Sequence, residues 1–433
     1  MTSGRIDRGA VFVGVTVAGL VLLVAARLAC VDGILRRVSI DGPSMAPAFL
    51  GRHYAAGCVD CGFPLFFDAD HVPDDERYVC PNCGFIHEEL PRDSIRPAQA
   101  VLIDRWPLVW RQPRRGEVVA CRAPDGAATV KRVAWLPGER PAIVEGDLYD
   151  GERLLRAPLD EARRRRLLVH DDAHRPTKTT AAPPRWRGDG WQGDRERYRL
   201  EMDAAQKDDR WLVYDQWPAT LDATRRTTSF PVTDNDSYNQ GQTVRELHIA
   251  HDVGLTCNVL ASGPFRLVAW DGKRRMEVEV QPQRRAVLRI NGNEADRRPL
   301  ARAHFRGPCL VEFGLCDEQV YLALDGQTIF CRAYQRDKNS RAEAPHPLAI
   351  GAASEGFEVS QVCVWRDIYY LDAAGLSRGW QSGRQLGGRE YGLLGDNQPV
   401  STDSRQWERV GLARAAIWGL VYRPFWNAWG GTP

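Results

Sequence analysis

The sequence predicts a mainly β protein with one apolar N-terminal helix, and three observations support this. Short alternating stretches separated by turn dipeptides such as Asn291-Gly292 recur through the second half of the chain. One uncharged apolar run, residues 10–26, lies near the N-terminus. Two Cys-x-x-Cys pairs stand 18 residues apart. A chain of 433 residues is long enough for two or three folded units.

The bulk composition is that of a globular protein. Apolar residues make up 43% of the chain and charged residues 26%, and the formal net charge is only +2. Such a small charge does not indicate a nucleic-acid partner. The one concentrated positive run, Arg163–Arg166, predicts a solvated helix face or loop, with contact to anionic lipid headgroups as the alternative.

The N-terminal apolar run predicts a single membrane-spanning helix over residues 10–31, after a short tail at 1–9. A spanning helix needs about 17–25 apolar residues. Arg27 interrupts the run, but its long side chain can reach the headgroups. Membrane lipid is therefore an expected partner. A cleavable signal peptide is the alternative, and basic residues on both flanks leave the orientation open.

The two Cys-x-x-Cys pairs predict an inserted zinc ribbon over residues 52–90. In such a ribbon, two tight turns place four thiolates tetrahedrally around one structural Zn²⁺. Two disulfides are the alternative, favoured in an oxidising compartment. The predicted ligands are Cys58, Cys61, Cys80 and Cys83.

A larger insertion, residues 160–382, predicts an antiparallel β-sandwich entered through the linker Pro176–Pro184. Asn291-Gly292 and Asp325-Gly326 are hairpin turn signals, and residues 309–330 read as a strand meander. The pattern is similar to concanavalin-like or laminin-G-like jelly rolls. Such folds bind carbohydrate or peptide on a concave face, although core packing is the expected role of most of the tryptophans here.

Three separated segments carry side chains suited to hydrolysis. Ser44 follows a Gly-Pro turn, and Lys131 stands among β-branched residues in a predicted strand. Burial favours the neutral form of a lysine amine, which can then accept a proton from a serine hydroxyl. Ser–Lys pairs are a known variant of the catalytic triad. The third segment is the polar loop that follows Leu394.

Taken together, these segments resemble the boxes of type I signal peptidases. The stretch GPSMAP resembles the serine box, VKRVAWLPGE the lysine box and GDNQPVSTDSR the closing box. The resemblance implies a β-rich catalytic core formed by residues 32–158 together with 383–425. It makes Ser44 the nucleophile, whose backbone N–H also serves the oxyanion hole, and Lys131 the general base. Ser401 would orient the amine, and the supporting residues would be Asp396, Asp403 and Arg405.

The same resemblance implies a membrane-bound serine endopeptidase that removes signal peptides from exported preproteins on the extracytoplasmic side. Preprotein signal peptides and the translocation machinery would be its partners, and catalysis would need no cofactor. Gly42 departs from family members that carry a hydroxyl at this position. Two alternatives stay open. One is a catalytically idle, membrane-anchored binding protein that uses the β-sandwich. The other is a Ser–Lys protease with one dedicated secreted substrate.

Overall fold

The computed structural model describes residues 8–27, 33–73, 75–177, 183–194, 196–201, 209–222, 228–240, 245–302, 304–337 and 343–423. Strands dominate these residues, as the sequence predicts. The α-helices are α1 (Arg8–Ala26), α2 (Pro107–Trp110) and α3 (Leu159–Arg165). The 3₁₀ turns are η2 (Pro43–Met45), η3 (Arg92–Ser94), η4 (Ser237–Asn239) and η5 (Arg414–Ala416).

Seven antiparallel strands form what we call the core sheet, with the order β1-β7-β31-β8-β9-β29-β30. The strands are β1 (Leu35–Ser39), β7 (Ala100–Asp104), β8 (Val118–Arg122), β9 (Ala128–Trp135), β29 (Glu390–Leu394), β30 (Leu412–Ala413) and β31 (Ile417–Tyr422). The last five residues of β9 are buried, and they include the charged residues Lys131 and Arg132 as well as three apolar residues. Segments from both ends of the chain therefore share one sheet.

A small sheet, ordered β12-β11-β10-β28, continues from the core sheet. It contains β10 (Pro141–Val144), β11 (Asp147–Asp150), β12 (Arg153–Leu154) and β28 (Gly379–Gln381). The Trp135 side chain is fully buried between the two sheets, and its indole N–H donates to the carbonyl of Tyr149 at 2.8 Å. The bond satisfies a donor that would otherwise be buried without a partner.

The four paired cysteines lie in a small unit of two sheets, which we call the cysteine unit. The first sheet has the order β3-β2-β6 and the second is the pair β4-β5. The strands are β2 (His53–Gly57), β3 (Pro64–Asp68), β4 (Tyr78–Val79), β5 (Ile86–His87) and β6 (Ile95–Arg96).

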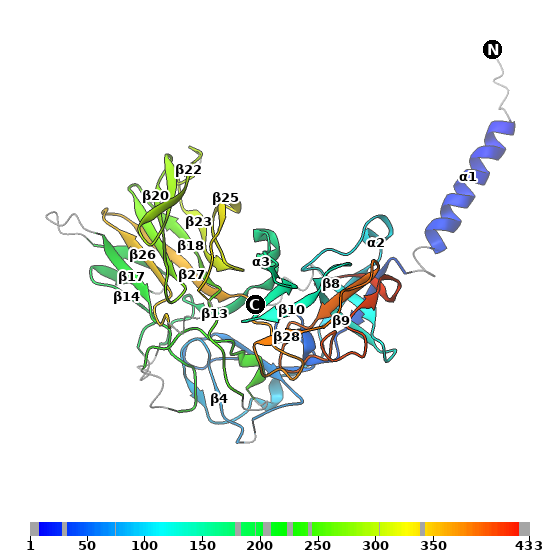
Figure 1. Cartoon of the computed structure of the whole chain (residues 1–433), viewed down its shortest axis with the longest axis horizontal. Helices are drawn as coiled ribbons and strands as arrows, with labels where there is room; N and C mark the ends of the chain where they lie inside the picture. Colours follow the sequence, from blue (N-terminus) through cyan, green and yellow to red (C-terminus); the bar gives the residue numbers. More distant parts are fainter. Residues whose placement is uncertain are drawn as a thin grey trace, which may run out of the picture.

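The large insertion folds as an antiparallel β-sandwich, which confirms the predicted architecture of this region (Figure 1). One sheet has the order β15-β16-β27-β18-β23-β24-β25, with β13 also paired to β27, and the other has the order β14-β17-β26-β19-β20-β21-β22. The strands of the first sheet are β13 (Leu167–Asp171), β15 (Trp191–Gly193), β16 (Arg197–Leu200), β18 (Val253–Leu260), β23 (Cys309–Cys316), β24 (Gln319–Leu324), β25 (Gln327–Ala333) and β27 (Glu358–Arg366). Those of the second are β14 (Trp186–Arg187), β17 (Arg210–Tyr214), β19 (Phe265–Trp270), β20 (Arg275–Gln281), β21 (Arg285–Ile290), β22 (Asn293–Pro299) and β26 (Leu348–Ala352).

Alternation of side chains builds the core between the two sandwich sheets. In β20, every second residue from Met276 to Val280 is fully buried, while the charged residues between them stay on the outer face. The hairpin signals are confirmed as well. Asn291 and Gly292 have φ angles of 49° and 82°, and Asp325 and Gly326 have 49° and 78°. Positive φ at both central residues is what a tight two-residue hairpin requires.

The membrane anchor predicted for residues 10–31 is not supported. Helix α1 has 19 residues and ends at Ala26, while residues 28–32 lie outside the described residues. Among the described helices, none is long and apolar enough to cross a membrane.

The prediction that Arg163–Arg166 forms a solvated face holds for Arg164, which is half exposed, and is wrong for the other three residues. Arg163 and Arg166 both donate to the Glu312 carboxylate in β23, at 2.6 and 2.7 Å. The buried Arg165 side chain contacts the carboxylates of Asp317 and Asp367 at 2.5 and 2.8 Å. The run therefore ties α3 to the sandwich, because buried carboxylates there need positive partners.

Truncation of Phe265 should destabilise the sandwich, because its fully buried ring packs against Phe305 and Phe357. We expect Phe265→Ala to lower the free energy of unfolding by about 3–5 kcal/mol. The measurement is denaturant unfolding of the full chain followed by tryptophan fluorescence. Leu260→Ala, at a side chain that is 40% exposed, is the control and should shift the transition little. Equal shifts for the two variants would contradict the assigned core.

Candidate functional site

Ser44 lies in the middle of η2, on a turn that is fixed to the core sheet. Gly42 precedes the turn in an extended conformation, and Pro43 supplies the preset φ of its first position. The next residue, Met45, is fully buried in a cluster with Val101 of β7 and other core-sheet residues. Because Met45 is buried, it fixes the turn against the core sheet. Ser44 itself remains partly exposed.

Lys131 lies on β9, opposite Val119 of β8, with only 2% of its surface exposed. Its Nζ donates a hydrogen bond to Ser401 Oγ at 2.9 Å. Burial lowers the pKa of the Lys131 amine below its ordinary value, although the negative charge of Asp403 acts in the opposite direction. The structure therefore brings Lys131 and Ser401 into direct contact across 270 residues of sequence.

Ser44 lies beside this pair. A Cβ built on Gly395 would collide with both the Ser44 carbonyl oxygen and Ser401 Oγ, so only glycine fits between them. Asn397 holds the same turn, because its backbone N–H donates to the Ser44 carbonyl and its Nδ2 to the Pro43 carbonyl, both at 3.1 Å. Within the described residues, no hydrogen bond joins the Ser44 hydroxyl to Lys131.

Two buried ion pairs support the loop that carries Ser401. Arg405 donates twice to the Asp403 carboxylate, at 2.9 and 2.7 Å, and that carboxylate also accepts the Gly395 N–H at 3.0 Å. Arg132 donates twice to Asp396, at 2.7 and 2.6 Å. In each ion pair, two parallel hydrogen bonds join the guanidinium group to the carboxylate. They fix the relative orientation of the two side chains, because the planes of both groups must be aligned.

Sequence reasoning missed Arg132 as the partner of Asp396. Arg132 directly follows Lys131, so the two side chains leave opposite faces of β9. A charged residue in a run that is otherwise apolar predicts a buried partner of opposite charge. The identity of that partner, 264 residues further along the chain, depends on the pairing of β9 with β29.

Chemically, this arrangement places an amine and a serine hydroxyl on neighbouring elements, β9 and η2. A neutral amine at Lys131 has a lone pair, and Ser401 restricts how that amine is oriented. The Ser44 backbone N–H is available on η2 as a donor toward a developing oxyanion. Gly42 offers no hydroxyl for the same purpose, and Pro43 has no N–H.

A cavity of about 1610 Å³ lies next to this centre, between the core sheet, the cysteine unit and the insertion. Pro47 to Leu50, on the same loop as Ser44, line one side, and Tyr238 and Asp396 line others. The cavity therefore adjoins the loop that carries Ser44, but it is not lined by Ser44, Lys131 or Ser401.

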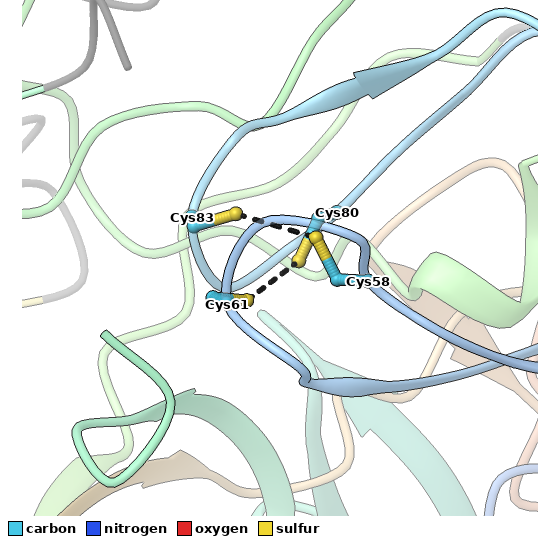
Figure 2. Close-up of side chains that lie close together, drawn as sticks. All are labelled: Cys58, Cys61, Cys80 and Cys83. Atoms are coloured by element: carbon cyan, nitrogen blue, oxygen red, sulfur yellow. Dashed lines mark hydrogen bonds between the residues drawn. The ribbon is translucent and has the colours of Figure 1, made fainter. Parts of the chain in front are cut away.

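The four predicted metal ligands come together in the cysteine unit (Figure 2). Cys58 and Cys80 each begin a matching turn, in which the N–H of Gly62 or Gly84 donates to the cysteine carbonyl at 2.8 Å. Gly62 and Gly84 have φ angles of 71° and 73°, which glycine adopts without strain. Two equal turns thus aim four sulfurs at one point.

The distances suit a tetrahedral zinc ion. Cys58 Sγ lies 3.6 Å from Cys83 Sγ, and Cys61 Sγ lies 3.7 Å from Cys80 Sγ. Sulfurs held about 2.3 Å from one Zn²⁺ are about 3.8 Å apart at the corners of a tetrahedron. A disulfide needs about 2.05 Å, so the alternative of two disulfides fits poorly. We propose that these cysteines hold one Zn²⁺ in a closed, structural site.

Comparison with known proteins gives structural matches of low overall similarity. No family model matches the chain, and no curated protein matches it. Solved structures that match include the carbohydrate-binding module CBM66 from Bacillus subtilis (9% identity, 42% of this chain and 92% of that chain, TM-score 0.23). Another is a protein with a galectin-like fold from Bacillus subtilis (11%, 42% and 86%, TM-score 0.23). A third is the exoplasmic domain of VIP36 in its Ca²⁺/Man-bound form (8%, 48% and 93%, TM-score 0.29).

These findings correct the resemblance to type I signal peptidases. No family model and no curated protein supports that assignment. The assignment is therefore wrong, and the expected partners that depend on it, signal peptides and the translocation machinery, fall with it. Three short motifs rich in turn residues and buried charges reflect local geometry, and they cover only a small part of the chain.

Removal of one cysteine should abolish metal binding. We expect the purified full chain to contain one Zn²⁺ per molecule and Cys80→Ser to contain almost none, because three thiolates form an incomplete structural site. The measurement is elemental analysis by mass spectrometry after dialysis against a weak chelator. Cys331→Ser, at an exposed cysteine outside the unit, is the control. Retention of a full equivalent of zinc by Cys80→Ser would refute the proposed ligand set.

Proposed function

We propose that this chain is a serine hydrolase with a narrow choice of polypeptide substrate, in which Ser44 is the nucleophile and Lys131 the general base. The observation that carries the proposal is the buried contact between the Lys131 amine and Ser401, beside the turn that holds Ser44. Burial disfavours the charged amine, and this is the property a base needs near neutral pH.

The proposed reaction uses only groups of this chain. The neutral Lys131 amine takes the proton of the Ser44 hydroxyl as its oxygen attacks a carbonyl carbon of the substrate. The tetrahedral oxyanion accepts a hydrogen bond from the Ser44 N–H. The protonated amine then returns the proton to the departing amine, which leaves an ester on Ser44. Water, deprotonated by the same amine, hydrolyses that ester and restores both side chains.

The surroundings of Ser44 argue for a narrow choice of substrate. The turn faces η4 of the insertion, and the cysteine unit packs against that same segment, since Gln240 bonds to Val79. A substrate must therefore fit between three units of the same chain.

A second candidate is a catalytically idle binding protein that uses the sandwich for carbohydrate or peptide. The observation that favours it is the absence, among the described residues, of a hydrogen bond between the Ser44 hydroxyl and Lys131. Catalytic hydrogen bonds often tighten only when substrate is bound, so this geometry does not decide against hydrolysis. Activity measurements separate the two candidates.

Loss of either reacting group should abolish cleavage. We expect the full chain to cut members of a mixed peptide library, and Ser44→Ala and Lys131→Met each to lower the rate by at least about a thousandfold. Mass spectrometry of the products gives the measurement. Ser39→Ala, at an exposed serine of β1, is the matched control. Cleavage that persists in both variants would exclude the proposed centre, and no cleavage by the parent chain would favour the binding protein.

The rate should also depend on pH in one direction. The base is active only when neutral, so kcat/KM should rise with pH through the pKa of Lys131 and then level off. Because burial lowers that pKa, the midpoint should fall below about 10.4, the ordinary value for lysine. The measurement is the initial rate of cleavage of one library peptide between pH 5 and about 10. A rate that falls steadily over this range would contradict Lys131 as the base.

A further inference from the structure

The insertion reaches back to the turn that carries Ser44. The residues that do so are 237–240, which form η4 and the position after it and which we call the strap. The strap lies before β18 of the sandwich, nearly 200 residues from Ser44 in sequence. Three successive strap residues, Tyr238, Asn239 and Gln240, contact other parts of the molecule.

Asn239 makes the contact nearest to the reacting groups. Its side-chain amide pairs with that of Asn397 through two hydrogen bonds, each of 2.8 Å, one in each direction. Asn397 in turn donates to the carbonyls of Ser44 and Pro43. An unbroken chain of hydrogen bonds therefore runs from the sandwich insertion to the backbone of the nucleophile.

The neighbouring strap residues keep Asn239 in place. The Tyr238 ring is 1% exposed and packs with Ala46 and Leu50, which follow Ser44 on the same loop. Its N–H donates to the Asp236 carboxylate at 2.9 Å, which caps η4. Gln240 accepts from the Val79 N–H at 2.8 Å and donates to the Val79 carbonyl at 3.1 Å. The strap thus joins the insertion, the cysteine unit and the Ser44 loop at one point.

We propose that Asn239 is a positioning residue for Ser44, and that the strap couples the sandwich to the reaction centre. The inference rests on the proposed hydrolase function and deepens it by assigning a regulatory role to the insertion. Asn397 holds the Ser44 carbonyl with its backbone N–H and the Pro43 carbonyl with its side-chain amide, and Asn239 fixes the orientation of that side-chain amide. Loss of the Asn239 side chain frees Asn397 to rotate, so the Ser44 hydroxyl samples positions outside the reach of the Lys131 amine.

The test compares Asn239→Ala with Asn235→Ala in the full chain. Asn235 is an exposed residue two positions before the strap and serves as a matched control. We expect Asn239→Ala to lower kcat about tenfold, because small misplacements of a reacting group carry large rate costs, and to leave KM within about twofold. Asn235→Ala should leave both unchanged. A rise in KM at constant kcat, or equal effects of the two variants, would overturn the proposal.

A double-mutant comparison tests whether Asn239 acts through Asn397. If it does, Asn239→Ala combined with Asn397→Ala should lose no more activity than Asn397→Ala alone. If the fold-loss of activity in the double variant instead equals the product of the two single-variant fold-losses, the two residues act independently. That result would overturn the proposed route.

Hydrogen exchange measured by mass spectrometry gives a readout that does not need activity. Asn239→Ala should speed exchange in peptides covering residues 41–50 and 394–400, while Asn235→Ala should not. If exchange is faster in Asn239→Ala but the parent chain cleaves no peptide, the hydrolase proposal is refuted, while the structural coupling between the strap and the Ser44 loop is supported. If exchange in Asn239→Ala is unchanged, the proposed coupling between the strap and the Ser44 loop is refuted, whether or not the chain cleaves peptides.

Discussion

The pairing of β9 with β29 is the constraint on which the rest of the structure depends. These strands lie side by side in the core sheet, although the whole sandwich is inserted between them. The buried ion pair of Arg132 with Asp396 and the bond from Lys131 to Ser401 both span this junction. Closing a long loop costs only slightly more than closing a short one, so a folded insertion with close ends is tolerated.

The buried charges at this junction define geometry more than they add stability. Removing an ion from water costs several kcal/mol, so a buried pair roughly balances its own desolvation. Loss of one partner is far more damaging, because the other is left buried without a counter-charge. Arg132 and Arg405 each have a carboxylate partner. Lys131 contacts a hydroxyl instead, and this difference leaves burial as the main influence on the pKa of its amine.

Local patterns predicted the fold where the stabilising interactions are local. The hairpins at Asn291 and Asp325 require positive φ angles at their central residues, and the Asn-Gly and Asp-Gly dipeptides there predict this conformation. The matching turns at Cys58 and Cys80 likewise follow from residues only a few positions apart. Prediction failed where burial decides the outcome. The run Arg163–Arg166 looks solvated in sequence, yet it contacts the carboxylates of Glu312 in β23 and of Asp317, which follows β23.

The sequence by itself determined the β-rich class, the sandwich and the four clustered thiols. It could do so because alternation, turn chemistry and cysteine spacing act over short distances along the chain. Only the tertiary structure decided that Arg132 partners Asp396 and that Asn239 reaches the Ser44 loop through Asn397. Those contacts join residues more than 150 positions apart, and nothing in either local segment specifies which distant element will pack against it.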